Sequence, residues 1–234
     1  MALLALIGIP VGLALDALIA QLAVPPEDGD GLEETPASPA SLLQAERGAL
    51  VLESERSAWL RRALVVAATS ALFALAAARY DEPGHVAIVA SYICVLLVCA
   101  GTDLLSYRVA NVVTYPAMLG ALVVGATVPG ASLGEVLAGG ALAAGVLLVP
   151  SLLTGGVGMG MGDVKLVAFV GLALGFESLV AALLFMALLG GLAAVLLLAT
   201  GLRQRGQPIP YAPFISLGAL AALLWQGAAF ATPA

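Results

Sequence analysis

The chain has 234 residues, of which 62% are hydrophobic and 10% are charged, with a net charge of −6 and a mean hydropathy of +1.08. This composition excludes a soluble globular domain, because a chain of this length cannot bury so much apolar surface. It predicts a multi-pass protein of the lipid bilayer, and no nucleic-acid partner is expected.

The apolar runs predict an all-α polytopic helix bundle. Helices are favoured over a β-barrel because the runs are continuous, not alternating, and each approaches the roughly 20 residues that cross the hydrocarbon layer. The full-length runs are 2–24, 60–79, 86–105, 112–128, 132–153, 178–200 and 211–230. A shorter run, 164–176, is either a short helix in a locally thinned bilayer or a re-entrant segment. About eight transmembrane helices are therefore predicted.

The first run, 2–24, is predicted to be a retained transmembrane helix. A cleaved signal peptide is less suitable, because the run has no basic start and is longer than a typical signal core. It contains Asp16, an intramembrane acid and hence a functional candidate. Asp16 belongs to no motif, so we expect it either to pair with a polar group across the bundle or to lie near the outer interface.

The segment 25–58 is predicted to be an acidic cytoplasmic loop, and 59–234 to be the membrane-embedded domain. The loop contains eight acidic residues against Arg47 and Arg56 and has no cysteine. A solvated linker is one interpretation. The alternative is that its negative charge attracts a basic segment of a substrate.

The cations predict the orientation, because cytoplasmic loops collect Lys and Arg. With 25–58 in the cytoplasm, only Arg79 lies outside, and the N-terminus is also outside. The remaining cations are cytoplasmic: Arg47, Arg56, Arg61, Arg62, Arg108, Lys165, Arg203 and Arg205.

No metal site is expected from the cysteine and histidine content. Cys94 and Cys99 lie in one apolar run and form no Cys-x-x-Cys pair, so they are interpreted as packing residues. The single histidine, His85, follows Pro83 and Gly84 and is expected in a surface loop.

Asp163 is the most informative acid in the chain. It follows the alternating glycines Gly158, Gly160 and Gly162 at the start of an apolar run. A carboxylate at membrane depth costs several kcal/mol unless it faces water, a partner or the bundle interior. The glycines would let an extended substrate backbone approach closely.

Asp103 occupies a similar position at the end of the run 86–105, just before a short turn that leads to Asn111. Both acids are predicted at the cytoplasmic face. Two carboxyl groups a few Å apart cannot both ionise and would share one proton. One would then act as a general base on water and the other as a general acid on the scissile amide. Either aspartate can fill either role.

The alternative is that both acids are ordinary interfacial residues, Asp103 paired with Arg108 and Asp163 with Lys165. Against this, Lys165 lies two residues beyond Asp163, so it should point away from that acid and toward lipid headgroups. Thr102 and Ser106 are expected to hydrogen-bond to Asp103.

Three segments resemble the type IV prepilin leader peptidases, which are membrane aspartyl proteases of the GxGD class. The run 155–166, GGVGMGMGDVKL, resembles the second signature of that family. The stretch from Asp103 through Arg108 to Asn111 is similar to the first signature. The run 208–214, PIPYAPF, resembles the proline-rich start of the last helix, with Pro210 and Pro213 as site-shaping residues.

The resemblance implies that Asp103 and Asp163 are the catalytic pair and that no cofactor or metal is needed. The substrate would be a prepilin-like or pseudopilin precursor, whose short basic leader is cut at the cytoplasmic face of a bacterial or archaeal inner membrane. Such a peptidase serves type IV pilus assembly or protein secretion.

Two departures from the family pattern matter. Val109-Ala110 replaces the usual Ile-Pro before Asn111, which predicts a looser turn. The loop 25–58 lacks the two Cys-x-x-Cys pairs that bifunctional members carry, so structural zinc is excluded there and N-methylation of the product is not expected.

Other functions remain as alternatives. A preflagellin-type peptidase uses closely related chemistry, whereas a presenilin-like protease normally has Tyr-Asp where this chain has Thr102-Asp103. An ion-coupled transporter also uses glycine-broken helices and acids, but near the bilayer centre. An assembly scaffold would not need two glycine-framed acids on one face.

Overall fold

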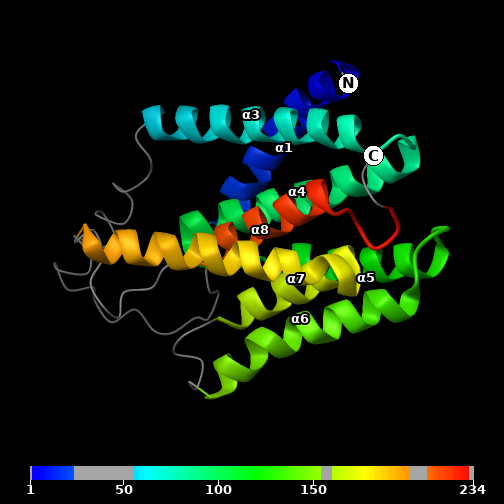
Figure 1. Cartoon of the computed structure of the whole chain (residues 1–234). Coiled ribbons are helices and arrows are strands. Elements are labelled where there is room, and N and C mark those ends of the chain that lie inside the picture. The colour runs from blue at the N-terminus through cyan, green and yellow to red at the C-terminus, as the bar shows by residue number, and fades with distance from the viewer. Residues whose placement is uncertain (1, 24–54, 154–159, 201–209, 232–234) are drawn as a thin grey trace, which may run out of the picture.

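A computed structural model of the protein describes residues 2–23, 55–153, 160–200 and 210–231. These residues form helices joined by short turns (Figure 1). Within the described ranges there is no β-strand, only an isolated bridge between Ala228 and Ala231. The helices are α1 (Ala2–Ala23), α3 (Glu55–Arg79), α4 (Pro83–Ser106), α5 (Asn111–Thr127), α6 (Leu133–Leu153), α7 (Met161–Ala199) and α8 (Ala212–Trp225). The all-α class is confirmed.

Five helical stretches are long and apolar enough to cross a membrane, namely those in α1, α3, α4, α6 and α7. The apolar helices α5 and α8 are shorter. The prediction of a multi-pass membrane protein is therefore confirmed, whereas the number of eight spans and the outside N-terminus stay predictions. The acidic segment lies outside the described residues except for its last four, which form the start of α3.

Helix α7 consists of two helical stretches that meet at Gly175, where the chain turns back on itself (Figure 1). Gly175 has φ 72° and ψ −179°, a conformation that is readily available only to glycine. The turn falls between the predicted runs 164–176 and 178–200. The sequence therefore located the break, and the first stretch is the shorter of the two.

Helices α6 and α7 approach each other closely. A Cβ atom at Gly139 would meet the carbonyl oxygen of Gly171, and one at Gly171 would meet that of Gly139. The two backbones are therefore in direct contact, as small residues permit in membrane helices. The first stretch of α7 also supplies Leu166 and Phe169, which are completely buried in the core.

Asp16 is buried between α1 and α3, where it forms ion pairs with two arginines. Arg61 Nε lies 2.8 Å from Oδ1 of Asp16, and Arg62 Nε lies 3.2 Å from Oδ2. The expected partner across the bundle is confirmed. Asp16 lies beside the first turns of α3.

His85 lies in the first turn of α4, so the surface-loop interpretation is wrong. Its ring packs against Phe230 with 5.1 Å between centroids, and its Nε2 is 3.2 Å from a carboxylate oxygen of Glu82. Pro83 is the reason, since proline fits the first position of a helix and here begins one. Cys94 is half-buried and Cys99 is buried, and both are free thiols, as expected for packing residues.

Candidate active site

Asp103 lies in the last turns of α4 and is only 5% exposed. Its Oδ2 accepts a hydrogen bond of 2.9 Å from the backbone N–H of Ala212, the first residue of α8. The first N–H groups of a helix have no partner within the helix and carry partial positive charge. The start of α8 therefore holds the Asp103 side chain in place.

The proline-rich sequence before α8 explains why Ala212 is the donor. Pro213 has no N–H, and the N–H groups of Phe214 and Ile215 both bond to the carbonyl of Tyr211. Ala212 thus supplies the one N–H of this turn that points to Asp103. Sequence reasoning missed this contact, although the signal was present: a proline just inside a helix start predicts where the unpaired N–H groups lie.

Asp163 lies in the first turn of α7 and is half-buried. Its backbone N–H donates to the carbonyl of Gly160 at 3.1 Å, which closes the first turn. The carboxyl group of Asp103 is near enough to repel that of Asp163 electrostatically. The structure therefore brings the two sequence-predicted acids together from helices α4 and α7.

The alternative of ordinary interfacial ion pairs is wrong for the part of the chain that the structure describes. There, neither Asp103 nor Asp163 forms a salt bridge with Arg108 or Lys165. The Asp103 carboxyl group is a charged neighbour of Asp163. Two acids without a cation between them are suited to sharing a proton.

Lys165 contacts α5, and its location at the lipid headgroups stays a prediction. Its Nζ donates a hydrogen bond of 3.0 Å to Oδ1 of Asn111 and lies 5.0 Å from the centre of the Tyr115 ring. Asn111 is the exposed first residue of α5. The side chain of Asn111 is thus used to join α5 to α7 beside the two acids.

Thr102 and Ser106 do not hydrogen-bond to the Asp103 side chain, contrary to expectation. The hydroxyl of Thr102 donates to the carbonyls of Val98 and Cys99, and that of Ser106 donates to the carbonyl of Thr102. Helical Ser and Thr commonly bond to the preceding turn in this way. Both hydroxyls are satisfied within α4.

The glycines before Asp163 have different surroundings. A Cβ atom at Gly162 would lie 3.0 Å from Cβ of Val109, so this glycine permits the turn after α4 to approach α7 closely. At Gly160 a Cβ atom would lie 3.6 Å from Oδ2 of Asp163, which is an ordinary contact. Gly158 lies outside the described residues. Pro210 is half-buried just before α8.

The turn between α4 and α5 is held without the proline of the family pattern. Tyr107 adopts a left-handed conformation with φ 53°, and its N–H bonds to the carbonyl of Asp103 at 2.9 Å. Ala110, in the position of that proline, has φ −71° and ψ 111°. This φ is one that proline itself would impose, so the backbone keeps a proline-compatible shape here.

Comparison with known protein families agrees with the two aspartate motifs. Residues 90–195 match the model of the type IV leader peptidase family. This range includes both Asp103 and Asp163. The family resemblance that the motifs predicted is therefore confirmed over these residues.

Several curated proteins resemble part of the chain, and all of those described here are named prepilin leader peptidase/N-methyltransferase. The protein of Aeromonas salmonicida strain A449 is 39% identical over 75 residues, which is 32% of this chain and 26% of that protein. The Bacillus subtilis protein is 41% identical over 68 residues, 29% of this chain and 27% of its own. The Pseudomonas aeruginosa protein is 37% identical over 75 residues, which is 32% of this chain and 26% of that protein.

The chain thus aligns with about a quarter of the length of each relative. No solved structure matches it.

Proposed function

We propose that the protein is a membrane aspartyl endopeptidase that removes the short basic leader from type IV prepilin-like or pseudopilin precursors. The observation that carries the proposal is the proximity of Asp103 and Asp163, two acids from separate motifs within the region that matches the leader peptidase family. The names of the relatives supply the substrate class.

In the proposed reaction, the two carboxyl groups share one proton. The ionised carboxylate takes a proton from a water molecule as the oxygen of that water forms a bond to the scissile carbonyl carbon. The protonated carboxyl group polarises the carbonyl and then gives its proton to the leaving nitrogen, so that the C–N bond breaks. A carboxylic acid and an amine terminus result, and the pair again holds one proton. No metal or cofactor takes part.

The surroundings give each remaining site residue a role in this proposal. The N–H of Ala212 holds Asp103 in position, and Pro210 and Pro213 set the start of the helix that provides it. Asn111, through Lys165, fixes α5 next to α7. Gly160, which has room beside Asp163, together with Gly158 and Gly162, would allow an extended leader to approach the acids.

We place the cleavage at the cytoplasmic face of a bacterial or archaeal inner membrane. The support is the distribution of cations, which assigns the ends of α4 and α7 that carry the acids to the cytoplasm. Although the relatives are also named N-methyltransferases, we propose a peptidase without methyl transfer. The segment 25–58 has no cysteine.

The test is cleavage of a co-expressed prepilin in membranes by the wild type, Asp103→Asn and Asp163→Asn. Both substitutions keep the size of the side chain but remove the shared proton. Asp81→Asn serves as the matched control, because Asp81 is an exposed acid just before α4, at the opposite end from Asp103. We expect loss of processing in both site variants at normal abundance and normal processing in the control. Wild-type processing by either site variant would refute the aspartyl pair.

A preflagellin-type specificity is distinguished by offering a preflagellin precursor in the same assay. Preferential cleavage of that precursor would show that the substrates are preflagellins and not prepilins. The proposed chemistry of Asp103 and Asp163 would be unaffected. A transporter would cleave neither precursor.

A further inference from the structure

The end of α8 is held by two side chains from the junction of α3 and α4. The hydroxyl of Tyr80 donates a hydrogen bond of 2.6 Å to the carbonyl of Leu223, and Nε of Arg79 donates one of 3.0 Å to the carbonyl of Leu224. Arg79 is the last residue of α3, and Tyr80, which follows it, is buried. A junction far away in the sequence therefore fixes this end of the helix.

The carbonyls of Leu223 and Leu224 have no partner within α8. The last bond of the helix runs from the N–H of Gln226 to the carbonyl of Ala222, and the N–H of Gly227 returns to the same carbonyl. The C=O groups that follow are unpaired in the helix and carry partial negative charge. A hydroxyl and a guanidinium group satisfy them here, and a cation is favourable at the C-terminus of a helix.

The other end of α8 meets an acid from the same part of the chain. Asp103 accepts the N–H of Ala212 at the start of α8, where an acid is favourable, and Arg79 binds at its end. Arg79 comes just before α4, and Asp103 lies in the last turns of α4. The stretch 79–103 thus holds α8 at both ends.

A third contact lies between these two. The hydroxyl of Ser216 in α8 donates to the carbonyl of Leu96 in α4 at 3.0 Å, and both groups are buried. Hydrogen bonds between helices are important in lipid, where the hydrophobic effect does not drive helices together. The contacts at the start, middle and end of α8 therefore define its position along its own axis.

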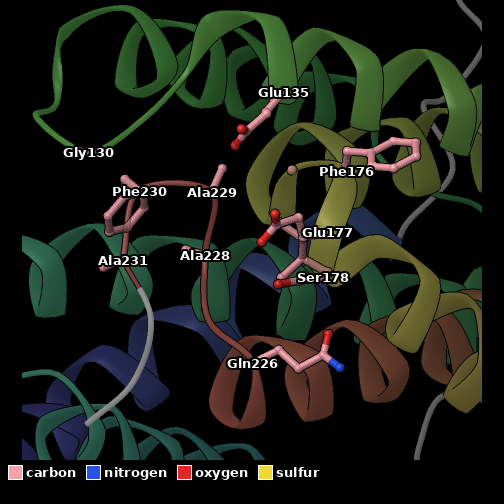
Figure 2. Close-up of a pocket in the computed structure, with 12 residues that line it drawn as sticks. Gly130, Glu135, Phe176, Glu177, Ser178, Gln226, Ala228, Ala229, Phe230 and Ala231 are labelled. Atoms are coloured by element: carbon pink, nitrogen blue, oxygen red, sulfur yellow. The ribbon is translucent and has the colours of Figure 1, made fainter.

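The chain beyond α8 contacts other helices and not the end of α8. Gly227 has φ 110°, as is common for the glycine that ends a helix, and the chain then runs through Ala229 to Phe230 (Figure 2). The N–H of Ala229 donates to the carbonyl of Ala173 in α7 at 3.1 Å, and Phe230 packs on His85 of α4. These contacts order the same end of the bundle but leave the last carbonyls of α8 to Arg79 and Tyr80.

The contact with α8 also explains why an arginine occurs at position 79. Arg79 is the one cation in the sequence that the predicted orientation leaves outside. Lys and Arg collect in cytoplasmic loops, so an arginine on the other side calls for a specific use. Binding the carbonyl of Leu224 is such a use.

We propose that Arg79 and Tyr80 are positioning residues for the peptidase reaction. By holding the end of α8, they keep the N–H of Ala212 on the carboxyl group of Asp103 at the other end. The inference rests on the proposed function, because it concerns how a catalytic acid is kept in place. Neither residue touches the acids. The fourteen-residue helix α8 transmits the effect, since coupling between distant sites is carried by rigid secondary elements.

The test compares the wild type, Tyr80→Phe, Arg79→Met and the double variant in nanodiscs. One measurement is hydrogen exchange at the N–H of Ala212, resolved by mass spectrometry of overlapping peptides, with the amides of the first stretch of α7 as the internal reference. The other is kcat and KM for cleavage of a prepilin. In the double variant we expect exchange at Ala212 to be about tenfold faster, the reference to be unchanged and kcat to be about tenfold lower. KM should stay the same, because the two residues do not touch the leader.

Three further variants serve as comparisons. Arg79→Lys keeps a cation with a donor and should recover most of the loss in kcat caused by Arg79→Met. Asp81→Asn changes an exposed acid next to the pair and should match the wild type in both measurements. Asp16→Ala, which removes an ion pair between α1 and α3, should lower stability without changing kcat per folded molecule.

Three outcomes would overturn the proposal. These are wild-type exchange at Ala212 in the double variant, equally faster exchange in the α7 reference, which would indicate a general loss of stability, and a raised KM with unchanged kcat. Failure of the proposed function would be seen separately, as no cleavage of prepilin by the wild type. Faster exchange at Ala212 alone would then still support the role of Arg79 and Tyr80 in holding α8 on Asp103.

Discussion

Lys165 on α7 donates a hydrogen bond of 3.0 Å to the side chain of Asn111 at the start of α5. Asn111 follows Asp103 after a short turn, and Lys165 follows Asp163 within the same helix. One side-chain contact therefore links the two chain segments that carry the acids. The position of the acids relative to one another depends on such links between helices, because no disulfide bond joins α4 to α7.

Because of this hydrogen bond, we expect a double-mutant cycle to show that the contributions of Lys165 and Asn111 to stability are coupled. Lys165→Met and Asn111→Ala should each lower the free energy of unfolding by about 0.5 to 1 kcal/mol, since the bond is exposed to solvent. The double variant should be no less stable than the worse single variant, because the second change removes nothing further. Unfolding of the four proteins in mixed micelles measures this. Additive losses would mean that the two side chains act separately.

Two substitutions at Asp103 should separate stability from chemistry. Asp103→Asn retains an oxygen that can accept the N–H of Ala212, so its stability should stay close to that of the wild type. Asp103→Ala leaves this buried N–H without a partner and should cost about 1 to 3 kcal/mol. Both variants should lack peptidase activity. If the two unfold at the same denaturant concentration, the contact with α8 does not contribute to stability.

Gly162 is predicted to be needed for packing and not for its backbone conformation. Gly162→Ala places a methyl group 3.0 Å from Cβ of Val109 and should destabilise the fold by about 1 to 3 kcal/mol. Val109→Gly in the same chain should restore much of the loss, because it removes the Cβ atom that the new methyl group meets. Gly160→Ala is the matched control and should unfold like the wild type. Failure of Val109→Gly to rescue would place the function of Gly162 elsewhere.

Asp16 should be important for stability and unimportant for cleavage. Asp16→Ala leaves Arg61 and Arg62 without their shared carboxylate and should cost about 3 kcal/mol. Cleavage per folded molecule should be unchanged, because these residues lie between α1 and α3 and not beside Asp163. Activity normalised to folded protein checks this. A specific loss of turnover would bring Asp16 into the catalytic site.

Ala110→Pro should stabilise the protein. Ala110 already has φ −71°, and its N–H donates no hydrogen bond among the described residues. Proline would then restrict the unfolded chain at little cost to the folded one, a gain of about 0.4 to 1 kcal/mol. Thermal unfolding in detergent measures the gain, with Ala110→Ser as a control for loss of the alanine. A lower unfolding temperature for Ala110→Pro would show that the turn around Val109 is incompatible with proline.

Hydrophobic run length predicted most of the helices well, because only helices satisfy their backbone in lipid. The run 112–128 corresponds to α5 at Asn111–Thr127, and 132–153 to α6 at Leu133–Leu153. The break at Gly175 was also visible, since a glycine and a charged residue interrupt the run there. The error at His85 arose because Pro83 was read as a turn signal, when proline also starts helices.

The part of the candidate site that depends on residue type could be predicted from the sequence. Asp103 and Asp163 stood out because acids are rare in apolar sequence. Their surroundings were less accessible. The donor to Asp103 is the backbone N–H of Ala212. Nearly every residue type has a backbone N–H, so the identity of residue 212 does not indicate this contact. Lys165 was judged from spacing along its own helix, which says nothing about the neighbouring Asn111 on α5.

The mutual contact of Gly139 and Gly171 restricts how this protein can change over evolution. The nearest atom to each α-carbon's added Cβ is a backbone carbonyl oxygen of the other helix, which no substitution can shorten. A larger residue at either position therefore has no compensating partner, unlike a substitution at Gly162, where Val109 can be made smaller. Among homologues that keep this helix pair, we expect these two positions to be invariant, whereas position 162 should covary with position 109.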